Sequence, residues 1–189
     1  MKKQVALIGL GNILLGDEGV GVRAIQALRD EFDFSDEVSL LDGGTLGLDL
    51  LPFLEGKDKV LFLDALDVKK KPGIITILED DEIPSFFGQA LSFHQVGLAD
   101  LLMACQLMGI KPARVSLIGI QPEKIETGLL LSQTIQENFE EYIQAILDKL
   151  GEWGIQSPKK RIEKNNKSCD FRVSTLNPGL ETRNPKLIP

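Results

Sequence analysis

The chain has 189 residues, a net charge of −7, and 43% hydrophobic and 26% charged residues. This length suits one well-buried domain, and the acidic balance argues against a nucleic-acid binder. No apolar stretch is long enough to cross a bilayer, and two cysteines, Cys105 and Cys169, make no disulfide framework. The composition therefore indicates a cytoplasmic enzyme or binding protein without membrane insertion.

Hydrophobic periodicity predicts an alternation of strands and helices along the chain. In chain order, we expect strand 3–9, helix 19–32, strand 37–42, a short helix within 45–56, strand 58–65, strand 73–79, a loop over 80–93, helix 94–109, strand 114–120 and helix 132–150. This alternation predicts a three-layer α/β/α domain, with a mostly parallel five-stranded sheet and helices on both faces. The strand at 73–79 has no helix before it and is expected to pair antiparallel at an edge.

The last part of the chain has a different composition. Residues 157–189 hold eight Lys/Arg and three Asp/Glu, whereas residues 1–156 hold 13 and 25. Four of the nine prolines also lie in this segment, which has no sustained apolar period. We expect a folded domain over 1–156 and a basic, flexible tail over 157–189.

The glycine-rich stretch at 9–21 follows a predicted strand and opens a predicted helix, as in dinucleotide-binding loops. Asp42, at the end of the second predicted strand, stands where a ribose-binding acid would lie. Against this reading, Leu14 occupies the place of the third glycine, and Asp17 and Glu18 would oppose a diphosphate. A nicotinamide-dinucleotide-binding protein stays open as an alternative.

Polar residues collect where the predicted parallel strands end. Because ligands bind outside the carboxyl ends of such strands, these residues are expected on one rim: Asn12, Asp17, Glu18, Asp42, Asp64 and the single histidine, His94. Glu18, Asp64 and His94 form a mixed oxygen and nitrogen set that suits a divalent ion such as nickel, zinc or manganese. Each residue alone has a simpler interpretation: Glu18 as a charge at a helix N-terminus, Asp64 as the cap of a turn, and His94 as a surface histidine. The metal site depends on their convergence.

Four sequence blocks carry a family resemblance. GLGNILLGDEGVGVR, LLDGGTLGLDLL, FLDAL and SFHQVGLADLL, in this order and spacing, closely resemble the hydrogenase maturation proteases. These endopeptidases trim the C-terminus of the large subunit of nickel–iron hydrogenases. The resemblance runs from about residue 3 to 155, and it implies a twisted, mostly parallel sheet. It also implies that Glu18, Asp64 and His94 are metal ligands and catalytic residues.

The resemblance further implies a substrate and a set of assisting residues. The substrate is a large-subunit precursor that presents its own bound nickel, for which other divalent metals can substitute. Asp17 and Asp42 are candidates for assisting catalysis, and the residues expected beside the substrate are Asn12, Gly43, Gly44 and Thr45. A nickel checkpoint or delivery protein that does not cleave is a further alternative. We expect a monomer with no nucleic-acid partner.

Overall fold

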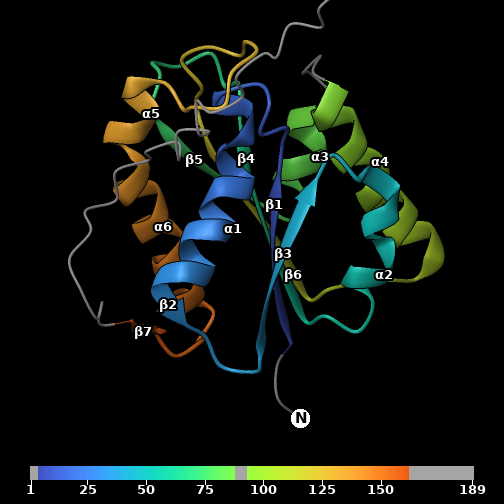
Figure 1. Ribbon diagram of the computed structural model, residues 1–189. Helices are drawn as coiled ribbons and strands as arrows, with labels where there is room; N and C mark the ends of the chain where they lie inside the picture. Colours follow the sequence, from blue (N-terminus) through green and yellow to red (C-terminus); the bar gives the residue numbers. More distant parts are fainter. Residues whose placement is uncertain (1–3, 88–92, 162–189) are drawn as a thin grey trace, which may run out of the picture.

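A five-stranded sheet runs through the centre of the molecule in the computed structural model, which describes residues 4–87 and 93–161 (Figure 1). Its strands are β1 (Val5–Leu10), β3 (Val38–Gly44), β4 (Lys59–Ala65), β5 (Ile75–Glu79) and β6 (Arg114–Ile120), in the order β3-β1-β4-β6-β5. The β5 strand lies at an edge and runs antiparallel to β6, while the other neighbours are parallel. The predicted fold class and edge strand are confirmed.

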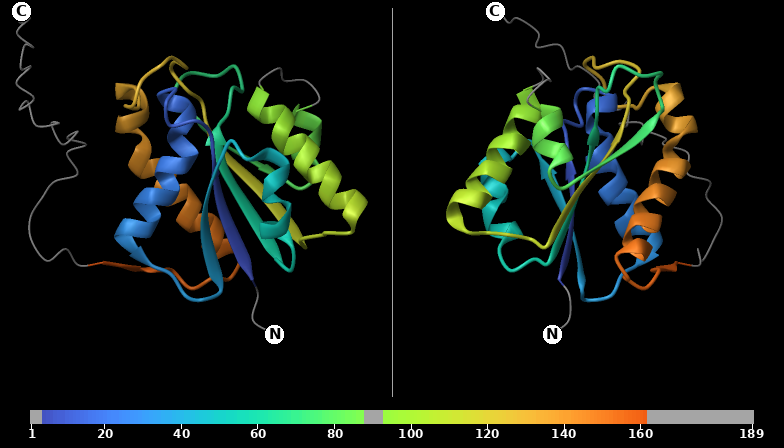
Figure 2. Two further views of the ribbon diagram at one scale, coloured as in Figure 1. Left: turned by 45° about the vertical axis from the view of Figure 1, so that its right-hand side comes forward. Right: turned by 180° about the vertical axis from the view of Figure 1, so that it is seen from behind.

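Helices cover both faces of this sheet (Figures 1 and 2). One face carries α1 (Val20–Glu31), α5 (Gln133–Glu137) and α6 (Phe139–Glu152), and the other carries α2 (Leu51–Leu54), α3 (Glu82–Phe87) and α4 (Phe93–Met108). Two 3-10 turns, η1 (Asp17–Gly19) and η2 (Gly47–Leu50), precede α1 and α2. Of the helices in the described part of the chain, none combines the length and apolar character needed to span a membrane.

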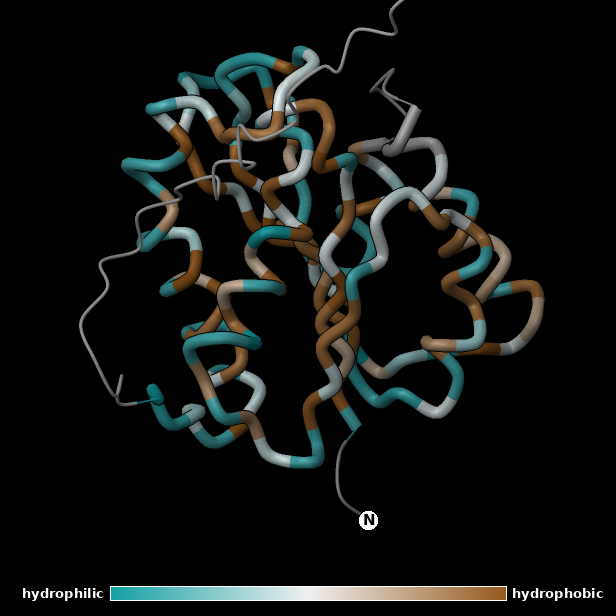
Figure 3. The backbone as a smooth tube through the Cα atoms, viewed as in Figure 1, coloured by the Kyte–Doolittle hydropathy of each residue, from teal (hydrophilic) through white to brown (hydrophobic). Residues whose placement is uncertain are grey.

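Two hydrophobic cores flank the sheet because the central strands point alternate residues to opposite faces. The core beneath α1 and α6 includes Leu7, Ile25, Leu61, Leu63 and Ile146. The core beneath α2 and α4 includes Ile8, Leu54, Phe62, Leu101 and Leu117. The strands are consequently apolar on both sides, which Figure 3 shows as a brown centre between helices with teal segments.

Some local predictions are wrong. The predicted loop over 80–93 contains α3, where Ile83 is fully buried and the Glu79 N–H donates to Glu82 Oε2 at 2.9 Å. The single helix predicted over 132–150 is divided at Asn138, whose side-chain amide donates to the Thr134 carbonyl at 2.8 Å. Both features depend on tertiary packing or on side-chain hydrogen bonds, which the hydrophobic periodicity of the sequence does not reveal.

The first residues of the predicted tail are attached to the domain. A short antiparallel ladder joins β2 (Phe32–Asp33) to β7 (Lys159–Lys160), and Arg161 Nε forms an ion pair with Asp33 Oδ1 at 2.7 Å. The remainder, residues 162–189, lies outside the described residues. The domain boundary after residue 156 and the flexibility of the tail stay predictions.

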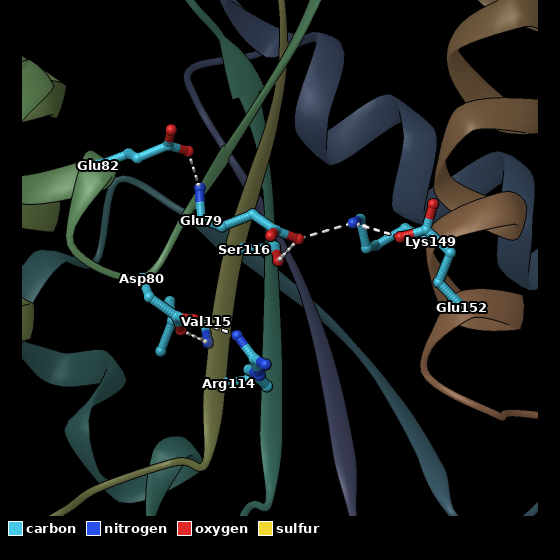
Figure 4. A network of polar contacts seen from close by, with 8 residues as sticks. All are labelled: Glu79, Asp80, Glu82, Arg114, Val115, Ser116, Lys149 and Glu152. Carbon is cyan, nitrogen blue, oxygen red and sulfur yellow. Dashed lines mark hydrogen bonds and ion pairs between the residues drawn. The ribbon is translucent and has the colours of Figure 1, made fainter.

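A polar network ties the edge strand β5 to its neighbours (Figure 4). Lys149 Nζ on α6 donates to Glu79 Oε1 at 2.7 Å and also contacts Glu152. Asp80, just after β5, accepts from Arg114 Nη1 at 2.8 Å and from the Val115 N–H at 2.9 Å. These contacts lie toward the amino ends of the parallel strands, opposite the rim that carries the candidate site.

Gly21, in the first turn of α1, lets that helix approach the sheet closely. A β-carbon at Gly21 would lie 2.0 Å from the carbonyl oxygen of Leu63 in β4. Gly21→Ala is therefore expected to displace α1 and lower the free energy of unfolding by about 2 kcal/mol, despite alanine's higher helix propensity. Urea unfolding measures the difference. Gly151→Ala in α6 is the control, because nothing lies within 4 Å of its added methyl group. Equal stability of the two variants would contradict the prediction.

Candidate functional site

The carboxyl ends of the parallel strands form the rim on which the candidate residues lie. In the sheet register, Gly9 of β1 pairs with Asp42 of β3 on one side and with Leu63 of β4 on the other. Asp64 follows Leu63, so Asp42 and Asp64 reach nearly the same level of the sheet, on strands separated by β1. The glycine-rich loop after β1 passes over this edge and places η1 beside the end of β4 (Figure 1).

Asp64 is a buried carboxyl group at the end of a hydrophobic strand. It is 2% exposed, and its Oδ1 accepts the Ala65 N–H at 2.8 Å. Burial raises the pKa of Asp64, the hydrogen bond from Ala65 lowers it, and the negative charge of Glu18 raises it, and together they bring it to about 7. Asp64 thus changes protonation state near neutral pH.

Glu18 lies in η1 and faces Asp64 closely enough for its charge to act on that carboxyl group. The Oε2 atom of Glu18 is itself buried. Two carboxylates that face each other away from water repel, and a cation between them removes that repulsion. The structure therefore brings together two of the three predicted ligands at the rim, and their binding of a metal ion stays a prediction.

His94 is the second residue of α4, and the first turn of this helix lies at the same rim (Figures 1 and 2). Gly97, one turn further along, lies against Gly47 after β3. A β-carbon added at Gly97 would lie 3.9 Å from the Gly47 Cα atom. The side chain of His94 falls outside the described residues. Within the part of the chain that the structure describes, no three His, Cys, Asp or Glu side chains form a metal-binding cluster. The role of His94 stays a prediction.

Asp17 has a different environment from its neighbour Glu18. It is 1% exposed and accepts four hydrogen bonds: from the N–H groups of Glu123, Lys124 and Ser132 at 3.0, 3.2 and 2.6 Å, and from the Ser132 hydroxyl at 2.8 Å. These bonds join the glycine-rich loop to the loop between β6 and α5. The geometry assigns Asp17 an anchoring function that also holds Glu18 in place. Its assisting catalytic role stays a prediction.

Asp42 faces away from the carboxylate pair. Leu41 packs with the α4-side core, and the Gly43 β-carbon position lies 2.8 Å from Ile8 Cγ2 of that core. Strand alternation then points the exposed Asp42 side chain toward the α1 face. An assisting role for Asp42 stays a prediction that requires a substrate reaching both faces.

Asp64 directly follows Leu63, which packs in the α1-side core, and precedes Ala65, which contacts the same core. Alternation therefore directs the Asp64 side chain to the α4 face, where α4 begins. The two aspartates at this rim thus serve different faces of the sheet.

The residues expected beside the substrate surround the same rim. Asn12 is half-buried, and its Oδ1 accepts the Leu14 N–H at 3.0 Å, which shapes the turn after β1. Gly43 is buried, and the Gly44 carbonyl accepts the Gly11 N–H at 2.9 Å. Thr45 is exposed and does not cap the next helix, which begins after Leu46. Their contact with substrate stays a prediction.

Tyr142 is a site-supporting residue that the sequence pattern did not single out. Its buried hydroxyl group donates to the Ile118 carbonyl at 2.9 Å and to the Asp64 carbonyl at 3.4 Å. Burial raises the pKa of Tyr142 well above its ordinary value, so the hydroxyl group keeps its proton. Tyr142 is the only tyrosine of the chain and lies on the apolar side of a predicted helix. These two features could have indicated a buried hydroxyl group near the site.

The nicotinamide alternative fits this geometry poorly. In a dinucleotide-binding loop, the pyrophosphate lies at the first turn of the helix after β1. Here that turn is preceded by the buried carboxylate of Asp17 and by Glu18. Both would repel a diphosphate, so the loop does not suit this ligand.

Comparisons with known proteins point to one family. Residues 22–149 match the model of the hydrogenase maturation protease family. The chain is 38% identical over 161 residues to the hydrogenase 2 maturation protease of Escherichia coli, an alignment that covers 84% of this chain and 98% of that protein. It is 39% identical over 154 residues to the hydrogenase expression/formation protein HupD of Rhizobium leguminosarum, covering 80% and 76% of the two chains.

Solved structures agree with these sequence matches. The hydrogenase maturating endopeptidase HybD from Escherichia coli superposes with a TM-score of 0.78 at 37% identity, covering 82% of this chain and 98% of that chain. A nickel–iron hydrogenase maturation protease from Thermococcus kodakarensis superposes with a TM-score of 0.65 at 28% identity, covering 78% and 98%.

Proposed function

The chain belongs to the hydrogenase maturation protease family, and on this premise we propose that it removes the C-terminal extension from a nickel-loaded precursor of a nickel–iron hydrogenase large subunit. The observation that carries the proposal is the pair formed by Glu18 and Asp64, two close carboxyl groups at the rim of the sheet. Such a pair is suited to binding a divalent ion that arrives with the substrate.

Each candidate ligand has a proposed role. Glu18 and Asp64 contact the nickel that the precursor presents, and His94, in the first turn of α4, supplies a nitrogen ligand. Contact with the ion checks that nickel is present and positions the scissile bond. In the chemical step, the nickel presented by the substrate would polarise the scissile carbonyl, and a carboxylate of the Glu18–Asp64 pair would activate the attacking water. Other divalent ions of similar ligand preference can substitute.

One experiment tests this function. The purified full chain is incubated with large-subunit precursor that has or lacks nickel, and the products are weighed by mass spectrometry. We expect loss of the extension only from the nickel-loaded precursor and only with wild-type enzyme, not with Glu18→Gln or His94→Ala. Nickel-dependent binding without any cleavage would instead identify a checkpoint or delivery protein. Cleavage that is independent of nickel would contradict nickel recognition.

We infer a monomeric enzyme that acts in the cytoplasm, where the large-subunit precursor is its partner. The acidic balance of residues 1–156 supports a protein partner over nucleic acid.

A further inference from the structure

Two loops at the carboxyl rim present an exposed apolar surface, which we call the apolar ridge. One loop follows β1 and the other joins β6 to α5. The ridge consists of five large side chains, each between 40% and 57% exposed: Ile13, Leu14, Ile125, Leu129 and Leu130. Exposed apolar side chains that gather in one place mark interaction surfaces more often than isolated ones do.

The ridge is held in a defined shape by backbone contacts between its two loops. The Gly16 N–H donates to the Gly128 carbonyl at 2.9 Å, and the Gly128 N–H donates to the Leu14 carbonyl at 2.9 Å. Arg23 on α1 also donates to the Leu129 carbonyl. Because the backbone is fixed, these apolar side chains stay at the surface without collapsing into the core.

The ridge is continuous with the candidate site. Asp17 binds the N–H groups of Glu123 and Lys124 in the second loop, and the next residue of the chain is Glu18 of the carboxylate pair. A hollow of about 500 Å³ lies along the same loop and is lined in part by Leu129 and Leu130. A chain bound at the rim can therefore continue onto the ridge.

Fixed negative charge accompanies the apolar surface. A hydrogen bond from Thr134, and to a smaller extent one from Ser132, lowers the pKa of Glu123 below its ordinary value. This exposed carboxyl group therefore stays ionised. Lys124 is paired with Glu126 at 2.6 Å and offers no net positive charge to a ligand. The surface thus suits an apolar peptide segment that carries a basic residue.

We propose that the apolar ridge docks an apolar, basic-flanked segment of the large-subunit precursor adjoining its cleavage site. This inference rests on the proposed function. It adds to the Glu18–Asp64 site a second surface that binds the substrate chain. Docking on the ridge fixes the direction in which that chain leaves the rim, and it contributes binding energy from residues that take no part in the chemistry.

The test compares two double substitutions that each replace two exposed, large apolar side chains by serine. Leu14→Ser with Leu129→Ser removes the centre of the ridge. Met103→Ser with Leu107→Ser is the control, since these α4 residues are 64% and 83% exposed and belong to a helix that lies on the opposite side of the sheet from α1 and α6. The Kd for purified nickel-loaded precursor and the KM and kcat of its cleavage are measured for each protein. Thermal melting checks that each is folded.

We expect the ridge variant to raise Kd and KM by roughly tenfold with kcat nearly unchanged, while the control matches wild type. Unchanged Kd and KM in a folded ridge variant would overturn the proposal, and Leu130→Ser provides a second variant if the first does not fold. Self-association of the wild type that the ridge variant abolishes would assign the ridge to a second copy, also against the proposal. If wild type binds precursor through the ridge but never cleaves it, the proposed function fails while ridge docking stands.

Discussion

Asp64→Asn is expected to abolish processing of the precursor and, at the same time, to make the protein more stable. The substitution removes a carboxylate proposed to contact nickel, so we expect a loss of at least about a hundredfold in the processing rate. It also removes a buried ionisable group whose pKa lies near 7. The amide oxygen can still accept the Ala65 N–H, so the local backbone geometry should persist.

The gain in stability should depend on pH in a defined direction. The pKa of Asp64 is raised from 3.8 to about 7 by folding, so between these values the folded protein binds one more proton than the unfolded chain. The contribution of this group to stability therefore falls as pH rises through the window. Relative to wild type, Asp64→Asn should gain up to about 4 kcal/mol at pH 8 and about 2 kcal/mol at pH 5.

Urea unfolding at the two pH values measures this difference, and mass spectrometry of the precursor measures processing. Asp30→Asn, an exposed substitution near the end of α1, is the matched control and should change neither quantity. A variant less stable than wild type, or a gain that does not grow with pH, would contradict the raised pKa. Normal processing by folded Asp64→Asn would remove Asp64 from the site.

Asp17→Ala is expected to be strongly destabilising, in contrast to the substitution at Asp64. It leaves the N–H groups of Glu123, Lys124 and Ser132 without their buried acceptor. The loss of these charge-assisted bonds should lower the free energy of unfolding by about 4 kcal/mol. Processing should also slow, because the loop that carries Glu18 loses its anchor.

Two measurements separate anchoring from catalysis at this position. Amide hydrogen exchange should increase in the loop between β6 and α5 before any global change, and urea unfolding gives the stability loss. Asp17→Asn retains one acceptor oxygen, so its effects should be intermediate in both measurements. Unchanged exchange in Asp17→Ala would show that Asp17 does not hold this loop. Loss of processing by Asp17→Asn with normal exchange would favour the assisting catalytic role.

Much of the fold could be predicted because local and global signals agree. The central strands are continuous apolar runs, buried on both faces, and their predicted positions match β1, β4 and β6 closely. The antiparallel edge strand followed from the missing helix before it. By contrast, α3 and the division at Asn138 depend on one buried isoleucine and on side-chain contacts with the backbone. Such contacts leave no periodic signal in the sequence.

The candidate site, too, could be predicted from the sequence only in part. Parallel strands must end on one edge, so the sequence alone placed Glu18 and Asp64 on a common rim. It did not show that Asp17, the neighbour of Glu18, anchors a loop. That role depends on hydrogen bonds to the loop between β6 and α5, a segment more than 100 residues away.

Residue order and hydrophobic pattern by themselves determined the α/β layers, the shared rim and the family resemblance, because each depends on spacing along the chain. Only the tertiary structure decided which acids become anchors and which face one another, and that two distant loops form the apolar ridge. Burial and electrostatic coupling depend on neighbours that the folded chain brings together. The raised pKa of Asp64 is the clearest case, since the hydrophobic surroundings and the Glu18 charge act on it only after folding.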